Sequence, residues 1–479
     1  MLDGIPGSTA YALITRDRAT WEARFAARKD TSRDVGQFQE RAARITSAED
    51  LLKDYRTLQF VLTAFGLEGE IGKTAILRKL LTEDPTAEAS FANRMSDPRY
   101  RAFADAMAEW LPSEAVRARV AGTIGAGYQL LDPAMTEAQA REFRTQLAAA
   151  GTADALLADR ALADRTLAAF GLTPEAVSDA QLSLLLTEDP EAQDSFAARQ
   201  ADTAFRDYAR TMARVVVNPG VFDRIINGMD DAAPGEAVRI SGAARMVAAY
   251  AARFPAAPAR EIAAFGALAQ QASSAADILG NRALADDTMR AMGLDPGAVS
   301  DATLAKLLTE DPYDPSSYAA RQEDAAYAAY ARAMAAWVGN AGQARRLESG
   351  IVDRWTTNAF EIAQETGGVR AALYFRRVIA GIGSVNELMS DKVLMEVVRG
   401  ALGFGDSFAM MPFEQQQRAL SRRIDFESFR DPKAVDRLAQ RYLMTRQDAA
   451  TTSPLVALFG GSGSASDITS LGMTLRLRA

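Results

Sequence analysis

The chain of 479 residues contains no cysteine and no histidine. Without cysteine it has no disulfide and no thiol nucleophile. Without histidine the histidine-based catalytic pairs and the common zinc sites are excluded. An enzyme of this composition would have to work with carboxylates, lysine, tyrosine or a metal on oxygen ligands. No such constellation stands out, so we expect a protein that is not an enzyme, with no catalytic residues, no cofactor and no metal.

Long apolar runs and an excess of positive charge are also missing. No run of about 18 apolar residues occurs, so we expect no membrane span. The formal net charge is −8, and we expect no nucleic acid partner because such surfaces need clustered Lys and Arg. Residues 1–25 lack the basic start of a secretory signal, and Arg16 interrupts their apolar run. If the chain leaves the cytoplasm, we expect a route without a cleaved signal.

One stretch of the sequence occurs four times. The copies start at Ser47, Thr152, Ser274 and Ser384, which are 105, 122 and 110 residues apart. A period this long indicates a duplicated module of three to four helices rather than a small solenoid repeat. The first helical segment of each copy ends at a glycine suited to a left-handed cap; these are Gly66, Gly171, Gly293 and Gly403.

Each copy also carries an Asp or Asn a few residues after its start, namely Asp54, Asp159, Asn281 and Asp391. These residues are either exposed positions on one long helix or caps of a second helix that follows a short one. We favour the second alternative, because Asp and Asn prefer helix caps to helix interiors.

The first three copies contain Thr-Glu-Asp-Pro after a Leu-Leu pair, and the fourth copy has lost this motif. The proline ends the helix. Paired carboxylates suit acid–base or metal chemistry, but neighbours at a helix end rarely face one substrate, so we favour capping. Pro85 at the first position of a new helix behind an Asp84 cap is a further alternative. Ten residues after each Asp stands an Arg, and we predict an ion pair that closes the turn in each copy: Asp84 with Arg94, Asp189 with Arg199 and Asp311 with Arg321.

The fourth copy has instead an apolar stretch within residues 403–417. Its large apolar residues are Phe404, Phe408, Met410, Met411 and Phe413. They form either local core under a changed turn or an exposed protein-binding patch, a role for which Met-rich surfaces are suited.

The remaining segments differ from the repeat. From about Tyr11 an amphipathic helix is expected, with Tyr11, Ile14, Trp21 and Phe25 on one face. Residues 215–242 contain two Pro-Gly pairs and a Val-Arg-Ile run, which indicates a short strand or an extended loop. From Ala449 the chain reads as a tail, with a linker at 460–464 and an alternating end that could pair with a partner as a strand.

These patterns predict an all-α protein of four tandem quasi-repeated helical bundle modules with a flexible C-terminal tail. The predicted division is an N-terminal segment and helix, a first module, three further modules each with its connector, and a linker with tail. The corresponding ranges are 1–35, 36–111, 112–214, 215–338, 339–446 and 447–479.

The first copy resembles a known family. The matching segments are RDVGQFQERAARITSAEDLLKD (33–54), TAFGL (63–67), ILRKLLTEDP (76–85) and FANRMSDPRYRAFADA (91–106). They are similar to an alphaproteobacterial domain family of unknown function whose genes lie among flagellar genes. The resemblance implies a motility-linked, non-enzymatic protein and brings no catalytic or ligand residues.

We therefore expect a structural component of the bacterial flagellum that coats or decorates the hook or rod. Its partners would be a flagellar axial protein and copies of itself, outside the cell on the proximal flagellum. The alternative is a cytoplasmic scaffold or chaperone for flagellar assembly.

Overall fold

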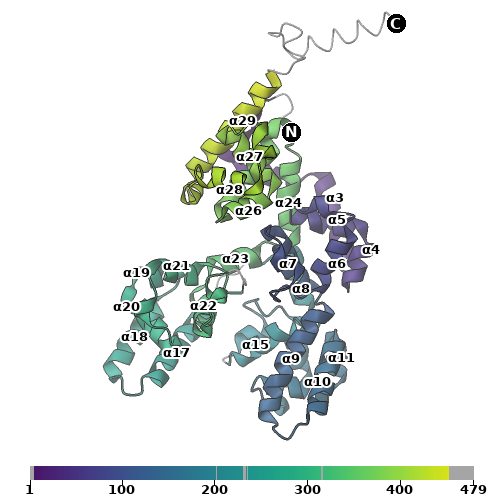
Figure 1. Ribbon diagram of the computed structural model, residues 1–479. Coiled ribbons are helices and arrows are strands. Elements are labelled where there is room, and N and C mark those ends of the chain that lie inside the picture. Colours follow the sequence, from purple (N-terminus) through teal and green to yellow (C-terminus); the bar gives the residue numbers. More distant parts are fainter. Residues whose placement is uncertain (1–4, 201, 230–233, 235, 314–316, 452–479) are drawn as a thin grey trace, which may run out of the picture. The chain divides into compact units, whose positions relative to one another are not determined.

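The computed structural model describes residues 5–200, 202–229, 234, 236–313 and 317–451 (Figure 1). Within them all regular secondary structure is helical, with 29 α-helices, several 3-10 turns and no strand. One isolated parallel bridge joins Thr152 to Val217. The expected all-α fold is confirmed. None of the described helices is long and apolar enough to cross a bilayer.

The chain divides into two compact units. The first comprises residues 1–32, 96–98 and 356–479, and the second comprises 33–95 and 99–355. The first three sequence copies lie in the second unit, apart from residues 96–98, and the fourth copy lies in the first.

One order of elements occurs in all four copies: a short helix, a longer helix, a 3-10 turn, a third helix, a short helical turn and a long helix. The first copy has α4 (Ala48–Lys53), α5 (Tyr55–Ala64), η1 (Glu68–Glu70), α6 (Thr74–Thr82), α7 (Phe91–Arg94) and α8 (Pro98–Trp110). The second has α11 (Ala153–Ala158), α12 (Arg160–Ala169), η2 (Pro174–Ala176), α13 (Asp179–Thr187), α14 (Phe196–Arg199) and α15 (Ala204–Met212). The third has α19 (Ala275–Gly280), α20 (Arg282–Met292), η3 (Pro296–Ala298), α21 (Asp301–Thr309), η4 (Ala319–Arg321) and α22 (Ala325–Val338). The fourth has α26 (Val385–Ser390), α27 (Lys392–Leu402), η7 (Asp406–Met410), α28 (Phe413–Ser421), η8 (Phe426–Arg430) and α29 (Pro432–Thr451).

The other helices connect the copies. Before the first copy lie α1 (Gly7–Arg16), α2 (Arg18–Ala26) and α3 (Lys29–Ala42). The pair α9 (Glu114–Leu131) and α10 (Glu137–Ala150) precedes the second copy, and α16 (Pro219–Asn227), α17 (Glu236–Arg253) and α18 (Ala259–Gln271) precede the third. Before the fourth lie α23 (Ala341–Glu348), α24 (Ile351–Ile362), η5 (Thr366–Gly368), α25 (Val369–Val378) and η6 (Ile379–Gly381). Figure 1 shows α9 beside α10 and α17 beside α18.

Side-chain caps hold the start of each copy. The Ser47 hydroxyl accepts the Asp50 N–H at 3.2 Å and so caps α4. The side chains of Asp54, Asp159, Asn281 and Asp391 then cap the second helix of their copies. The second of the two alternatives is therefore confirmed.

The end of this second helix is also as predicted. Gly66, Gly171, Gly293 and Gly403 have φ of +67°, +75°, +87° and +69°. The residue after each glycine donates its N–H to the carbonyl five residues earlier, as Leu67 does to Leu62 at 2.8 Å and Leu172 to Leu167 at 3.1 Å. This is the Schellman arrangement, which needs a left-handed residue and so selects glycine.

Each of the first three copies has its own buried cluster. In the second copy the Thr166 hydroxyl lies 3.1 Å from the Tyr208 hydroxyl, and in the third Thr288 lies 3.1 Å from Tyr330. All four side chains are buried, and the hydroxyls satisfy one another. The first copy carries Val61 and Phe103 at the same positions, and both are buried.

The first unit packs the first two helices and the helices of the fourth copy around one core. Tyr11, Ile14 and Phe25 are buried in the same cluster as residues of α25, α27 and α29. The Tyr11 hydroxyl donates to the Asp436 carboxylate at 2.8 Å. The expected single N-terminal helix is instead two, because Asp17 leaves the helical conformation and caps α2.

One prediction for the connectors is wrong. The Val-Arg-Ile run at 238–240 lies inside α17, so it is no strand. Val217 is extended where it forms the bridge to Thr152, after which Asn218 caps α16 and Pro219 takes its first position. Residues 230–233 and 235 of this connector lie outside the described residues. The predicted linker at 460–464 and the strand after it lie outside the described residues.

Candidate functional site

The acidic pair of each Thr-Glu-Asp-Pro turn has two separate tasks. The glutamate carboxylate caps the short helical turn that follows: Glu83 accepts the Phe91 N–H, Glu188 that of Phe196 and Glu310 that of Tyr318, each at 2.5 Å. The capping interpretation is thus confirmed for the glutamates. Asp84 accepts the Thr86 N–H at 3.0 Å within a turn, and no helix starts at Pro85, so that alternative is wrong.

The aspartates form ion pairs with arginines other than the predicted ones. Asp84 pairs with Arg119, Asp189 with Arg224 at 2.8 Å and Asp311 with Arg346 at 2.6 Å, always across 35 residues. These arginines lie on α9, α16 and α23, the helix that follows each copy. The predicted partners Arg94, Arg199 and Arg321 are exposed at the ends of the short helical turns, whereas Asp84 and Asp189 are buried. The predicted pairs are wrong because the arginines that meet the aspartates are carried by the next long helix, which packs against the turn.

The helix after the second and third copies is docked tightly on the turn. The Asn218 amide donates to the Glu188 carbonyl at 3.1 Å while its oxygen accepts the Val221 N–H at 3.0 Å. Asn340 does the same with Glu310 and Gln343. Such a docked helix brings its backbone close: a Cβ on Gly220 would lie 2.2 Å from the Asp189 backbone nitrogen.

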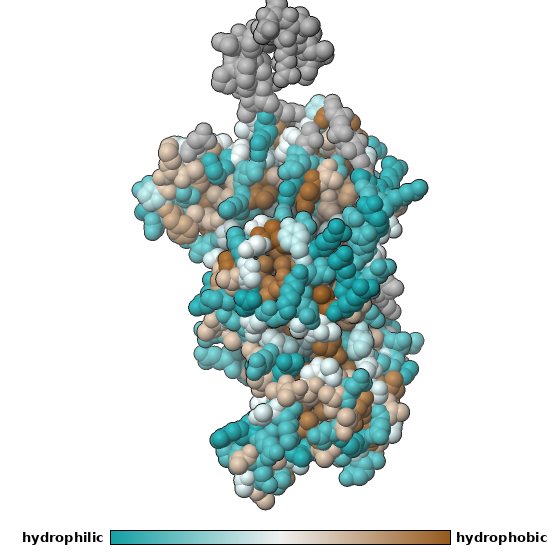
Figure 2. Space-filling view, turned by 90° about the vertical axis from the view of Figure 1, so that its right-hand side faces the viewer, coloured by the Kyte–Doolittle hydropathy of each residue, from teal (hydrophilic) through white to brown (hydrophobic). Residues whose placement is uncertain are grey.

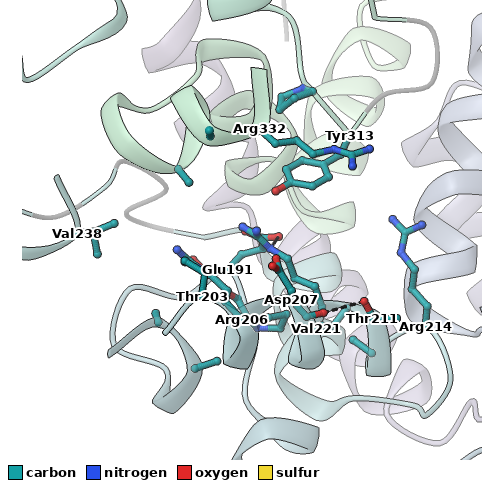
Figure 3. Close-up of a pocket in the computed structure, with 18 of the residues that line it drawn as sticks. Glu191, Thr203, Arg206, Asp207, Thr211, Arg214, Val221, Val238, Tyr313 and Arg332 are labelled. Atoms are coloured by element: carbon teal, nitrogen blue, oxygen red, sulfur yellow. Dashed lines mark hydrogen bonds and ion pairs between the residues drawn. The ribbon is translucent and has the colours of Figure 1, made fainter. Parts of the chain in front are cut away.

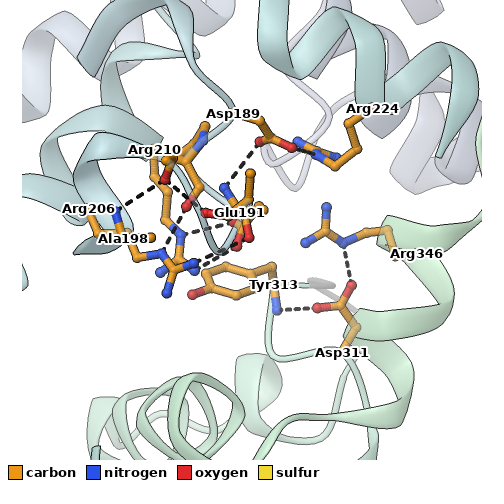
Figure 4. Close-up of polar contacts among 12 residues, drawn as sticks. Asp189, Glu191, Ala198, Arg206, Arg210, Arg224, Asp311, Tyr313 and Arg346 are labelled. Carbon is orange, nitrogen blue, oxygen red and sulfur yellow. Dashed lines mark hydrogen bonds and ion pairs between the residues drawn. The ribbon is translucent and has the colours of Figure 1, made fainter. Parts of the chain in front are cut away.

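A single carboxylate joins these arrangements. Glu109, on α8, pairs with Arg224 at 3.1 Å and with Arg346 at 3.3 Å (Figure 4 shows both arginines). Burial acts to raise the pKa of Glu109, but Arg346 and Arg224 outweigh it and hold the pKa below its ordinary value. For Asp189, burial is the stronger effect and raises the pKa despite Arg224.

Beside this network lies a cavity of 1310 Å³ within the second unit (Figure 3). Nine arginines and three carboxylates are among its described lining residues. They come mainly from the second and third copies and from the helices that follow them. The cavity is therefore strongly positive, although the chain as a whole is acidic.

Tyr313 is the centre of the positive charge. The guanidinium carbons of Arg210, Arg332 and Arg346 lie 5.2, 5.5 and 5.9 Å from the centre of its ring, within cation–π range. Burial raises the pKa of the Tyr313 hydroxyl. The phenol is therefore neutral at pH 7 and does not neutralise the arginines.

Glu191 faces Tyr313 and is fully engaged. Arg210 binds its carboxylate with two hydrogen bonds of 2.9 and 2.7 Å. Burial would raise the Glu191 pKa, but Arg210 holds it far below its ordinary value. Figure 4 shows Arg206 on the same side of Tyr313 as Arg210. Arg206 donates to the backbone carbonyls of Pro190 at 2.8 Å and Glu191 at 3.3 Å.

The apolar stretch of the fourth copy divides between core and surface. Phe408 is 2% exposed and packs in the core of the first unit, with the ring of Phe404 at 4.4 Å. Met410 is 81% and Phe413 54% exposed, and Met411 is also exposed. The core interpretation is thus confirmed for Phe408, whereas Met410, Met411 and Phe413 are exposed and their role as a protein-binding patch stays a prediction.

The geometry suits anion binding better than metal binding. In the described part of the chain, no group of three or more Asp or Glu residues is placed to hold a metal ion. Sequence reasoning missed Arg119, Arg224 and Arg346, although their 35-residue distance from the Asp repeats in all three copies.

Comparison with known proteins adds a family. The sequence model of the family described as "Protein of unknown function (DUF1217)" matches residues 64–166 and 291–435, more than half of the chain. The chain belongs to this family. The match agrees with the resemblance to a family of unknown function, and the flagellar association of that family remains an expectation.

A similar solved structure is the crystal structure of an Agrobacterium tumefaciens protein. It is 23% identical, and the similarity covers 44% of this chain and 86% of that one. Its TM-score of 0.20 is too low to bear on the fold. A search of curated proteins found no match.

Proposed function

We propose that this DUF1217 protein is a structural component of the bacterial flagellum that coats or decorates the hook or rod by binding axial subunits and copies of itself. The support for the flagellum is the resemblance of residues 33–106 to a family encoded among flagellar genes. The support for binding other proteins is the exposed apolar patch of Met410, Met411 and Phe413.

This patch has the character of a contact surface. The methionine side chains adapt to different partners, and Phe413 offers a rigid anchor. Its base is firm because Phe404 and Phe408 hold the preceding turn on the core. On the face shown in Figure 2, hydrophobic side chains lie as separate patches among hydrophilic ones.

The proposal also takes the four copies to be one quasi-repeated module. The common order of elements, the caps and the glycine ends support this reading. Similar modules in a row offer similar faces, which suits a filament of identical subunits. Superposition of residues 47–110, 152–214, 274–337 and 384–445 in an experimental structure would test it, and a different helix packing in any of the first three would contradict it.

The direct test is fractionation of flagellated cells. We expect the protein in purified hook–basal bodies, detected by mass spectrometry and by imaging of labelled particles. If it stays in the cytosol and is absent from sheared or purified flagella, the structural role is wrong and the scaffold or chaperone role replaces it.

A variant tests the patch. Met410→Ser with Phe413→Ser should reduce cosedimentation of the purified chain with assembled hooks or rods. The matched control is Leu130→Ser, because Leu130 is 83% exposed in the second unit and is not part of the patch. Equal loss with the control would contradict a role for the patch.

A further inference from the structure

The cavity of the second unit is built from equivalent positions of two copies. Glu191 and Tyr313 both stand two residues after the Asp of their turn, in the second and third copy. Arg210 on α15 and Arg332 on α22 are likewise equivalent, 122 residues apart. Figure 3 shows Tyr313 and Arg332 on one side of the cavity and Glu191 and Arg206 on the other.

The carboxylates of this region are already taken by arginines. Glu191 binds Arg210, while Asp189 and Asp311 bind Arg224 and Arg346, which share Glu109. These pairs leave an excess of positive charge in the lining, whose one other carboxylate, Asp207, is exposed.

Arg206, Arg214 and Arg332 contribute to that excess. Among the described residues, no carboxylate forms an ion pair with Arg206, Arg214 or Arg332, and all three line the cavity. Arg206 is fixed by its bonds to the Pro190 and Glu191 carbonyls through Nε and Nη2, so its Nη1 group remains available as a donor. Burial and the neighbouring Arg210 lower the pKa of Arg206, and they outweigh the opposing effect of the Glu191 carboxylate.

We propose that this cavity binds a small multivalent oxyanion, a molecule with several phosphate or carboxylate groups, between Arg206, Arg214 and Arg332. Guanidinium groups bind both kinds of oxyanion through paired N–H donors, and arginines held in place lose little freedom on binding. The volume of 1310 Å³ admits a molecule of several such groups. The inference goes beyond the proposed function and does not depend on it.

Calorimetric titration of the full-length chain tests this site. The probes are sodium tripolyphosphate, sodium citrate and inorganic phosphate in a chloride buffer of low ionic strength. We expect one site for tripolyphosphate or citrate and weaker binding of inorganic phosphate. Whichever of tripolyphosphate and citrate binds more tightly shows which oxyanion the site prefers. Added salt should weaken this binding.

Two variants locate the binding. Arg332→Gln and Arg206→Gln should each reduce the affinity about tenfold or more, the usual effect of losing one charged hydrogen-bond donor. Arg332 is exposed, so its replacement leaves the fold intact, and an unchanged melting temperature of the free variant verifies this. The control is Arg260→Gln, because Arg260 is exposed on α18 and does not line the cavity.

The proposal is overturned if neither tripolyphosphate nor citrate binds. It is also overturned if Arg260→Gln weakens binding as much as Arg332→Gln does, since the anion would then bind to general surface charge. Unchanged affinity in both Arg332→Gln and Arg206→Gln would overturn the proposal as well.

Discussion

The close approach of α16 to the second turn can be tested by adding one methyl group. In Gly220→Ala the new Cβ would lie 2.2 Å from the Asp189 nitrogen, 2.8 Å from the Glu188 carbonyl carbon and 3.0 Å from the Thr187 oxygen. All three are backbone atoms, so no side chain can turn away. The helix has to move off the turn, which strains the Asn218 and Arg224 contacts.

The expected size follows from opposing effects. Overpacking a tight contact costs about 1–3 kcal/mol. Alanine in place of glycine in a helix gains up to about 1 kcal/mol in the interior and less near an end. Gly220 is the second residue of α16, so we subtract a gain of about 0.5 kcal/mol and expect Gly220→Ala to lower the free energy of unfolding by about 0.5–2.5 kcal/mol. Gly342→Ala should act in the same direction, because its Cβ would lie 2.3 Å from the Asp311 nitrogen.

Urea unfolding of the full chain, with hydrogen exchange at residues 219–227 as a local probe, is the assay. The matched control is Gly266→Ala on α18, where the nearest atom would be 3.8 Å away. This control should leave stability unchanged or raise it. If Gly220→Ala behaves like Gly266→Ala, then α16 is not docked on the turn and the reasoning about Asp189 and Arg224 fails.

Three further predictions follow from the same structure. Gly171→Val should destabilise the chain by about 1 kcal/mol or more in thermal melts. Gly171 has a φ of +75° and nothing lies within 4 Å of the added Cβ, so the cost comes from the backbone conformation alone. An unchanged melting midpoint would mean that Gly171 has ordinary helical dihedrals. Glu109→Gln should lose stability near pH 7, and this loss should become smaller as the pH falls toward 3. The reason is that the pKa of Glu109 in the folded chain lies below its ordinary 4.5. The ionised carboxylate therefore stabilises the fold fully above pH 4.5, and this stabilisation is lost as the pH falls through the folded pKa. A difference in unfolding free energy between variant and parent that stays constant from about pH 7 to about pH 3 in urea would contradict this. Calcium or magnesium should give a flat calorimetric titration, because the turn carboxylates are held by arginines and backbone N–H groups; a micromolar isotherm would contradict it.

Local features of the fold were predictable because their causes lie within a few residues. A cap such as Asp54 and a glycine such as Gly66 act on the helix next to them, so their chemistry is visible in the sequence. The same holds for the capping role of Glu83, although the helical turn that it caps starts eight residues later.

The partners of the aspartates were not predictable in this way. Arg94 is near Asp84 in the sequence but lies at the exposed end of α7, and the true partner Arg119 is on the next long helix. Proximity in the sequence was the wrong criterion. The recurring 35-residue distance was the better signal, because a contact that belongs to the module has to recur with the module.

The central carboxylate shows where even this criterion ends. Glu109 has Arg214 at the equivalent position of the second copy and Ala336 in the third. A search for recurring residues therefore passes over it. Yet Arg224 and Arg346 do recur. Each pairs with the aspartate of the copy that precedes it, and its guanidinium group has further N–H donors. One added carboxylate on α8 serves both, because the arginines of α16 and α23 reach it at 3.1 and 3.3 Å. A second carboxylate at position 214 would have reduced the positive charge of the cavity, whereas Arg214 adds to it. The difference between copies at this one position thus both joins the modules and leaves the charge to which an oxyanion would bind.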